Sequence, residues 1–278
     1  MTRPTTVGDA RLHATHLSIG YDKRPVSQDL CVTIPDTSFT VIVGPNACGK
    51  STLLRGMARL LKPQLGQVIL DGRDIHTLKP KEVATRLGLL PQSSLAPDGI
   101  RVADLVARGR YPYQKLIRQW TKTDEQAVLD AMGATGIQDL SGRLVDELSG
   151  GQRQRVWVAM ALAQATDILL LDEPTTFLDL RHQIELLELF TDLYLRGRTL
   201  VAVLHDLNQA ARYATHMIAM KDGQIVATGT PHEVVTADMV EHVFGVRCLI
   251  VADPAAGTPQ VVPLGRERSR SSRGGAHV

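Results

Sequence analysis

The chain has 278 residues, of which 44% are hydrophobic, 22% charged and 4% aromatic, and its formal net charge at pH 7 is +2. This composition is typical of a globular protein, and so small a net charge argues against nucleic acid as a main partner. No apolar run approaches the roughly 20 residues that a membrane span needs, and residues 1–6 lack the apolar stretch of a signal peptide. The three cysteines are scattered without metal-ligand spacing, which indicates a reducing compartment.

The N-terminal residues 11–43 are expected to form an antiparallel β region. Apolar and polar residues alternate imperfectly over 12–19, and the apolar run at 30–34 predicts another strand. Between these strands, residues 20–25 are expected to form a polar loop that carries Tyr21. From its position alone, Tyr21 is interpreted as a half-buried loop residue, and stacking on a planar base is the alternative.

A glycine-rich loop follows the buried strand that is predicted at 39–43. It fits the pattern G-x-x-x-x-G-K-[ST] and leads into a helix predicted at 52–61. In that context the backbone N–H groups cradle phosphate oxygens, the lysine reaches the β- and γ-phosphates, and the serine hydroxyl can bind Mg²⁺. A chance glycine turn that opens a helix is the alternative. The candidate nucleotide-binding residues are Gly44, Pro45, Asn46, Ala47, Cys48, Gly49, Lys50, Ser51 and Thr52.

Residues 93–165 are expected to be mostly helical. Before them, a strand predicted at 87–92 places Gln92 at a strand end, where open α/β sheets bind their ligands. Residues 109–113 are expected to break a first helix, and Thr123 and Gln126 are predicted to form the capping box of the next one. The glycine turn Leu148-Ser149-Gly150-Gly151-Gln152 opens a helix predicted at 153–164, which makes a second candidate anion-binding helix N-terminus.

Two apolar strands in the C-terminal half end in chemically active residues. The strand predicted at 168–171 ends in Asp172 and Glu173, and the strand at 199–204 ends in His205. Adjacent carboxylates at the end of a buried strand are costly without partners, and Mg²⁺ and a water nucleophile would supply them. For His205, a satisfied core histidine is the alternative. Strands alternating with helices predict an α/β fold with a mainly parallel core sheet.

Taken together, these motifs resemble the ATP-binding subunit of an ATP-binding cassette (ABC) transporter, a P-loop NTPase. The resemblance covers roughly 10–245. It implies one nucleotide-binding domain over 10–250, with the helical subdomain at about 93–165 and an N-terminal antiparallel β region. An Arg/Ser-rich tail at 262–278 is expected to be disordered.

The resemblance also implies roles for single residues. Tyr21 becomes the residue that stacks on adenine, which replaces the interpretation from position alone, and Asp179 marks the D-loop. The segment 175–178 before Asp179 departs from the small residues usual in the family. The implied catalytic residues are Glu173, His205 and Gln92, and the implied Mg²⁺ ligands are Ser51, Gln92 and Asp172.

The implied mechanism needs two cassettes stacked head to tail, expected to be identical. The signature residues Ser149, Gly150, Gly151 and Gln152 of one cassette would close on the ATP of the other. Implied partners are integral-membrane permease subunits as separate chains and, indirectly, a periplasmic or lipid-anchored solute-binding protein, with no nucleic acid. The implied location is the cytoplasmic face of the membrane, where the chain would be a peripheral subunit.

At the start of the phosphate-loop helix, the pKa of the Cys48 thiol is expected to be lowered.

The middle segment narrows the resemblance to the ATPase subunits of bacterial iron–siderophore importers. It reads Gly109-Arg110-Tyr111-Pro112-Tyr113-Gln114, followed by Arg118-Gln119-Trp120-Thr121. Tyr111, Tyr113 and Trp120 are candidate permease-facing residues, and packing inside the subdomain is the alternative. Heme and cobalamin importers are the alternative subfamilies. An ABC ATPase without a membrane partner and a P-loop kinase or GTPase are further alternatives, and the signature and His205 argue against the last.

Overall fold

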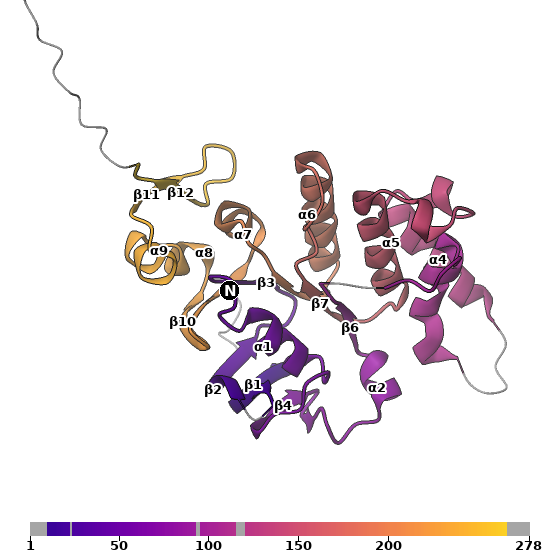
Figure 1. The fold of residues 1–278 in the computed structure, drawn as a ribbon, viewed down its shortest axis with the longest axis horizontal. Helices are drawn as coiled ribbons and strands as arrows, with labels where there is room; N and C mark the ends of the chain where they lie inside the picture. The colour runs from indigo at the N-terminus through magenta and orange to yellow at the C-terminus, as the bar shows by residue number, and fades with distance from the viewer. Residues whose placement is uncertain (1–9, 23, 93–94, 115–119, 266–278) are drawn as a thin grey trace, which may run out of the picture.

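The computed structural model describes residues 10–22, 24–92, 95–114 and 120–265 (Figure 1). Its centre is a six-stranded sheet of order β10-β9-β3-β8-β7-β6, in which all neighbouring strands but the β9–β10 pair run parallel. The mainly parallel sheet that the sequence predicts is therefore confirmed. The strands are β3 Phe39–Val43, β6 Leu87–Leu90, β7 Ile168–Asp172, β8 Thr199–Val203, β9 His216–Lys221 and β10 Gln224–Gly229.

Successive residues of the central strands point to opposite faces of the sheet, and both faces are covered. Phe39, Val41 and Val43 of β3 belong to one apolar core, whereas Ile42 belongs to the other. The first core packs under helices, where Phe39 meets Phe190 edge-on with 6.2 Å between ring centroids. Because both faces are buried, these strands are continuous apolar runs rather than alternating ones.

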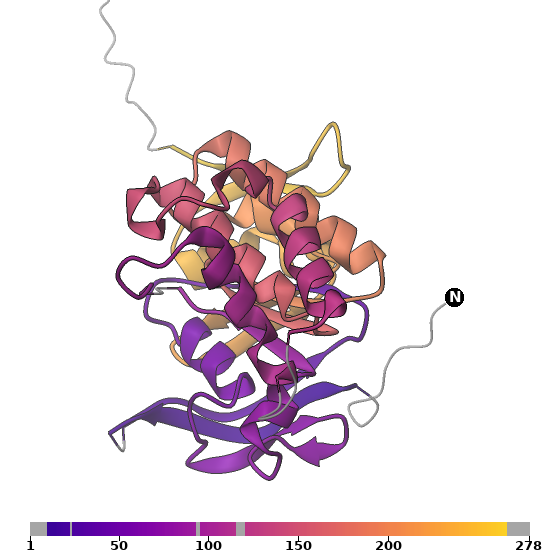
Figure 2. The ribbon, with the colours of Figure 1, turned by 90° about the vertical axis from the view of Figure 1, so that its right-hand side faces the viewer.

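The second core lies between the central sheet and a four-stranded antiparallel sheet of order β2-β1-β4-β5, at the base of the molecule in Figure 2. Helix α1 (Lys50–Met57) fills the space between them with Leu53, Leu54 and Met57. It begins at Lys50, two residues earlier than predicted, and it ends before residue 61, since Arg59 has a left-handed φ of 65°. The strands are β1 Leu12–Tyr21, β2 Arg24–Ile34, β4 Leu65–Leu70 and β5 Arg73–Asp74.

The predicted loop at 20–25 is instead the tip of a β-hairpin. Tyr21 is the last residue of β1, it pairs with Arg24 of β2, and β2 runs far longer than 30–34. At Gly20 a Cβ atom would lie 2.0 Å from the carbonyl oxygen of Arg24. Only glycine allows so close an approach of the two strands, and polar composition alone hides it.

The remaining helices fall into two groups. One group forms the helical part at the right of Figure 1, and the other covers the central sheet. Residues 109–113, predicted as a break, continue from α3 as the 3₁₀-helix η1. Helix α5 begins earlier than predicted, because Ser149 caps it and both glycines lie in its first turn. The bounds are α2 Pro80–Ala84, α3 Val102–Ala107, η1 Arg108–Tyr113, α4 Lys122–Ala134, η2 Gln138–Leu140, η3 Val145–Glu147, α5 Gly150–Ala163, α6 Leu180–Leu195, α7 Leu207–Tyr213, α8 Pro231–Val234 and α9 Ala237–Phe244.

The capping box of α4 lies two residues before the predicted one. The Thr121 hydroxyl accepts a hydrogen bond from Asp124 N at 3.2 Å, and the Asp124 carboxylate accepts one from Thr121 N at 3.1 Å. Asp124 also accepts the Arg110 guanidinium at 2.9 Å in an ion pair buried on both sides. Since Arg110 donates further to Ala163 O, this pair fastens η1, α4 and α5 together. Thr123 and Gln126 also have the spacing of a capping box, but among the described residues neither has an ion-pair partner like the one that Asp124 has in Arg110.

The C-terminal part extends beyond the predicted boundary at residue 250. Strands β11 (Cys248–Ala252) and β12 (Pro259–Pro263) form a hairpin whose Val261 is clamped to α7 by both amide atoms of Asn208. The first residues of the predicted tail, 262 and 263, therefore belong to a strand. Residues 266–278 of that tail lie outside the described residues, as do Arg118 and Gln119 of the middle segment.

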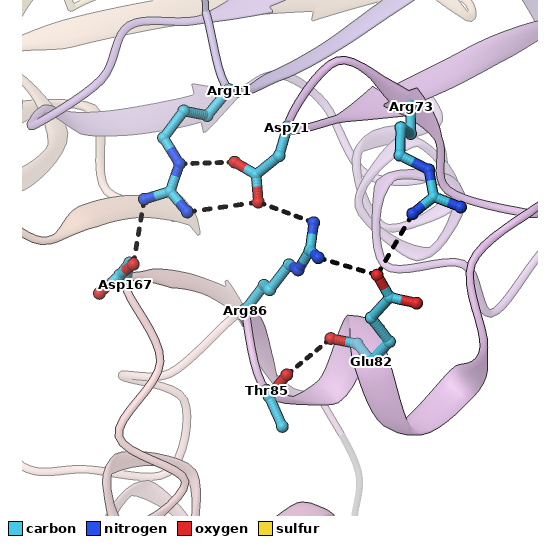
Figure 3. A network of polar contacts seen from close by, with 7 residues as sticks. All are labelled: Arg11, Asp71, Arg73, Glu82, Thr85, Arg86 and Asp167. Atoms are coloured by element: carbon cyan, nitrogen blue, oxygen red, sulfur yellow. Dashed lines mark hydrogen bonds and ion pairs between the residues drawn. The ribbon is translucent and has the colours of Figure 1, made fainter.

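A network of ion pairs ties the edge of the antiparallel sheet to the rest of the molecule (Figure 3). Asp71 lies between Arg11, at 2.7 Å, and Arg86, at 3.2 Å. Arg86 also contacts Glu82 of α2 at 2.8 Å, and Arg11 reaches Asp167 at 3.1 Å, just before β7. The hydrogen bond to Asp71, together with that to Asp167, raises the pKa of the Arg11 guanidinium, although its own burial acts in the opposite direction. In the described part of the chain, no helix has the length and apolar character to cross a membrane.

Replacing Asp124 by alanine should destabilise the protein strongly. The change leaves the buried Arg110 without its counter-charge, a loss worth about 3–5 kcal/mol in other proteins. Urea unfolding of the full chain would measure it. The control is Glu185→Ala, which removes the exposed partner of Arg181 on α6 and should change stability by less than about 1 kcal/mol. Equal losses in the two variants would contradict this reading of the buried pair.

Candidate nucleotide-binding site

A pocket of about 940 Å³ opens at the carboxyl ends of the parallel strands. The segments that follow β3, β6, β7 and β8 all contribute to it, which is the edge of an open α/β sheet where ligands bind. Most of the predicted site residues converge here. The lining consists of Val26, Gly44, Pro45, Asn46, Ala47, Gly49, Lys50, Ser51, Thr52, Gln92, Glu173, Thr176, His205 and Phe244.

The glycine loop is shaped by its close contacts with the β9–β10 hairpin beneath it. A Cβ atom at Gly44 would lie 2.2 Å from the carbonyl oxygen of Met220, and Gly223 N donates to Cys48 O at 3.0 Å. Gly49 has a left-handed φ of 104° and precedes α1, whose first turn has neither a side-chain cap nor an acidic residue. The first N–H groups of α1 are thus free to bind an anion.

Lys50 brings a positive charge to this loop without a counter-ion. Its side chain is buried, and its ammonium group donates to the carbonyl oxygens of Gly44 at 2.8 Å and Pro45 at 2.7 Å. Among the described residues, no carboxylate lies within ion-pair distance of it. A buried, uncompensated ammonium at the start of a helix favours a polyanionic ligand such as a triphosphate.

Asp172 supplies the negative counterpart on the other side of the pocket. It is buried, its Oδ1 accepts from the Ser51 hydroxyl at 2.8 Å, and its Oδ2 is buried with no hydrogen-bond partner. Burial is the main cause that raises the pKa of this carboxyl. A hydroxyl beside a carboxylate with a free oxygen is a donor set that suits Mg²⁺. The predicted third ligand, Gln92, donates its amide nitrogen to Glu173.

Glu173 is the most highly connected side chain of the pocket. Its Oε1 lies 2.8 Å from His205 Nε2, and its Oε2 accepts from Gln92 Nε2 at 2.8 Å and from the Thr176 hydroxyl at 3.3 Å. The backbone of Glu173 is left-handed, with φ 54°. Such strain in a residue other than glycine persists where the surroundings hold it, commonly at functional sites. The three predicted catalytic residues thus meet at one carboxylate.

Tyr21 lies beside this pocket, not in it. It lines a separate hollow of about 510 Å³ at the β1–β2 hairpin, and Val26 lines both hollows. Tyr21 is 43% exposed, and its hydroxyl accepts from Arg55 of α1 at 3.2 Å. An open aromatic face next to a phosphate-binding loop can stack on a planar base.

The signature residues and Asp179 are not brought to the pocket of their own chain. Ser149 and Gln152 form a capping box at the exposed start of α5, with hydrogen bonds of 3.1 and 3.2 Å. Asp179 caps α6 by accepting from His182 N, which is the main reason that its pKa is lowered. The exposed α5 N-terminus can therefore meet an anion only from outside this chain.

The structure differs from the expectations drawn from the sequence in the acidity of Cys48 and in three residues of the pocket lining. The pKa of the Cys48 thiol is raised, because burial outweighs the effect of Lys50. Val26, Thr176 and Phe244 also line the pocket, although no sequence motif marks them. Thr176 could have been found from its place just after Glu173. Val26 and Phe244 come from β2 and α9, and no local signal connects them to the loop.

The known proteins that this chain resembles are named as ATP-binding proteins of transport or import systems. Residues 27–176 match the ABC transporter family. The chain is 58% identical to the ferric enterobactin transport ATP-binding protein FepC of Escherichia coli, with 92% of this chain and 95% of that protein covered. It is 45% identical to the iron(3+)-hydroxamate import ATP-binding protein FhuC of Bacillus subtilis over 89% and 93%, respectively. It is 39% identical to the cobalamin import ATP-binding protein BtuD of Halobacterium salinarum, over 96% of this chain and 67% of that one.

Solved structures agree with the fold described above. An inward-facing metal-chelate type ABC transporter superposes with a TM-score of 0.78 and 26% identity, covering 92% of this chain and 97% of that chain. A dimeric ATP-binding cassette, MJ0796, in a post-hydrolysis state with ADP and Pi superposes with a TM-score of 0.71 and 26% identity over 79% and 98%.

Replacing Lys50 by alanine should weaken nucleotide binding at least about tenfold, which corresponds to about 1.4 kcal/mol. The variant loses the buried ammonium that faces the phosphates. Titration with a fluorescent ATP analogue would measure the affinity. Lys62→Ala, which removes an exposed lysine after α1, is the matched control and should bind as the wild type does. Unchanged affinity in Lys50→Ala would contradict the phosphate-binding role of the loop.

Proposed function

The chain belongs to the ABC transporter family as an ATP-binding subunit, and from this premise we propose that its ATP hydrolysis energises the import of iron–siderophore complexes. The observation that carries the proposal is the Glu173 carboxylate, held by His205 and Gln92 beside the phosphate loop. Phosphoryl transfer to water needs a positioned nucleophile and charge stabilisation on the γ-phosphate. Both requirements have candidate residues in this pocket.

Each side chain has a defined task in this proposal. Lys50 and the N–H groups of the loop bind the β- and γ-phosphates, and they stabilise the charge that develops in the transition state. Glu173 orients and polarises the attacking water. His205 holds that water and the γ-phosphate in line, since its ring nitrogen already lies at the carboxylate. Tyr21 stacks on the adenine.

Ser51 and Asp172, with Gln92 as a third ligand, are the residues that would hold Mg²⁺. Bound there, Mg²⁺ supplies positive charge to the β- and γ-phosphate oxygens. The partnerless Oδ2 of Asp172 supports this assignment, because a buried carboxylate oxygen without a partner is costly. Ser51 helps by keeping Asp172 Oδ1 toward the loop.

A second cassette completes the site. Ser149, Gly151 and Gln152 lie at an exposed helix N-terminus away from their own pocket, so they serve the ATP of a partner. The dimeric cassette among the solved relatives supports this arrangement. We propose that the partner is a second copy of this chain, with Asp179 at the interface.

Import further requires membrane permease subunits, which we place against the helical part of the cassette. Tyr111 and Trp120 are exposed there and suit a contact with a partner. Tyr113 faces inward instead, since the Arg110 guanidinium lies 3.9 Å from its ring centroid. The cassette then lies at the cytoplasmic face of the membrane. A solute-binding protein on the other side would deliver the cargo.

The cargo assignment is supported by the difference in sequence identity between relatives that are named for different cargoes. Identity is 58% to a ferric enterobactin transport subunit and 39% to a cobalamin import subunit. Iron–siderophore complexes are therefore proposed first, and cobalamin or heme is the alternative. An ABC ATPase without a transport role is less well supported, because the relatives compared above are named as transport or import proteins.

Glu173→Gln should bind ATP, form a stable dimer and hydrolyse ATP at least about a hundredfold more slowly. The amide keeps the shape of the side chain but cannot polarise the water. ATP turnover and size-exclusion chromatography with light scattering would measure both effects, with Glu185→Gln on the exposed face of α6 as the control. A monomer at high concentration with ATP would contradict the two-cassette arrangement.

Uptake in cells tests the cargo. Cells carrying Glu173→Gln in place of the wild-type chain should lose uptake of a radiolabelled iron–siderophore complex while heme and cobalamin uptake stay unchanged. Loss of heme or cobalamin uptake instead would keep the ATPase role and overturn the cargo. Unchanged uptake of all three would overturn the transport role.

A further inference from the structure

Two glutamines connect the segment after Glu173 with the helix after His205. Gln183 lies on α6 and Gln209 on α7, and neither lines the nucleotide pocket. Gln209 Nε2 donates to Gln183 Oε1 at 3.0 Å. Both side chains are half-buried, so this contact between two helices is partly shielded from water.

Gln183 holds the loop Thr175–Asp179 through its amide nitrogen. Gln183 Nε2 donates to Leu178 O at 3.0 Å and to Thr175 O at 3.5 Å. Two carbonyl acceptors on one side fix the amide orientation, because only the nitrogen can donate. The amide oxygen is left facing α7, where Gln209 uses it.

Gln209 is in turn fixed relative to His205. Asp206 caps α7 by accepting from Asn208 N at 2.8 Å and from Gln209 N at 2.9 Å. His205 immediately precedes this cap. A displacement of α7 therefore moves His205, and the contact with Gln183 resists that displacement.

These contacts close a ring around the catalytic carboxylate. His205 contacts Glu173 at 2.8 Å, and Thr176 of the loop donates to Glu173 at 3.3 Å. Glu173 and Phe177 both have left-handed backbones, with φ of 54° and 67°. Each such residue costs on the order of 1 kcal/mol, so the loop needs its neighbours to keep this conformation.

We propose that Gln183 and Gln209 are positioning residues that hold Glu173 and His205 in register for ATP hydrolysis. The inference rests on the roles proposed above for those two residues. The two glutamines should affect the chemical step of hydrolysis, because the ring of contacts includes the proposed water-orienting residues Glu173 and His205. No residue of the phosphate loop belongs to this ring. Loss of the link should lower kcat and leave the KM for ATP in place.

Steady-state ATP hydrolysis by the full chain tests the pair as a unit. Gln183→Ala and Gln209→Ala should each lower kcat about tenfold, equivalent to about 1.4 kcal/mol, with the KM for ATP changed less than about twofold. Since both act through one link, the double variant should be no slower than the slower single variant. Additive losses, unchanged kcat or a parallel rise in KM would overturn the proposal.

Asn208→Ala is the matched control. Asn208 is the neighbour of Gln209 on α7, but its amide clamps Val261 of the C-terminal hairpin instead. Its kcat should stay within about twofold of the wild type. A loss equal to that of Gln209→Ala would show that any loosening of α7 slows the reaction, and it would overturn the specific role of the link.

A donor-retaining variant provides a rescue. Gln209→Lys keeps a donor for Gln183 Oε1, so its kcat should exceed that of Gln209→Ala severalfold. Gln209→Glu places an acceptor against an acceptor and should not recover. Equal activity of the two would count against the hydrogen bond. Full activity of Glu173→Gln would overturn the proposed function and this link together, whereas an inactive Glu173→Gln with normal glutamine variants would overturn the link alone.

Discussion

The adjacent carboxylates at the end of β7 impose the constraint on which the rest of the site depends. The buried strand β7 ends at Asp172 and Glu173 follows it, so one buried and one partly buried negative group lie side by side in the chain. The two side chains meet this cost differently. Asp172 takes the Ser51 hydroxyl and keeps one oxygen without a partner, whereas Glu173 takes His205, Gln92 and Thr176. One carboxylate is thus open to a cation, and the other is held in place by donors.

The phosphate loop has the opposite charge and a different kind of support. Its shape comes from backbone contacts with the β9–β10 hairpin, where Gly44 passes over Met220 and Gly223 donates to Cys48. The antiparallel sheet contributes Val26 from the other side. Segments far apart in the chain therefore shape a loop that is continuous in the sequence. This packing also buries Cys48, which makes its thiol less acidic than its place at a helix start suggests.

The helical part keeps the start of α5 away from the pocket of its own chain. It is held together by the buried pair of Arg110 and Asp124, and it presents the capped start of α5 to solvent. One glutamine on each of α5, α6 and α7 meets the segment after Glu173 or another of the three: Gln154 donates to Pro174 O, Gln183 to Leu178 O and Gln209 to Gln183. The loop Thr175–Asp179 is thereby joined by hydrogen bonds to the helices that follow Glu173 and His205 in the chain.

Much of this protein could be predicted from its sequence, and the reason is that the decisive signals are local. The residues of the phosphate loop, the apolar runs of β3, β7 and β8 and the polar residues that end them are each contiguous, so pattern and spacing suffice to predict a mainly parallel sheet with its site at one edge. Local spacing failed at the start of α4, where Thr123 was predicted as the cap but Thr121 is the cap, because its partner Asp124 also pairs with the buried Arg110. It also failed at the hairpin of Tyr21, where the close approach of two strands at Gly20 is a pairing property. The placement of Val26 and Phe244, the clamp of Asn208 on β12 and the contact of Gln183 with Gln209 join residues that no sequence period relates, so only tertiary packing could decide them.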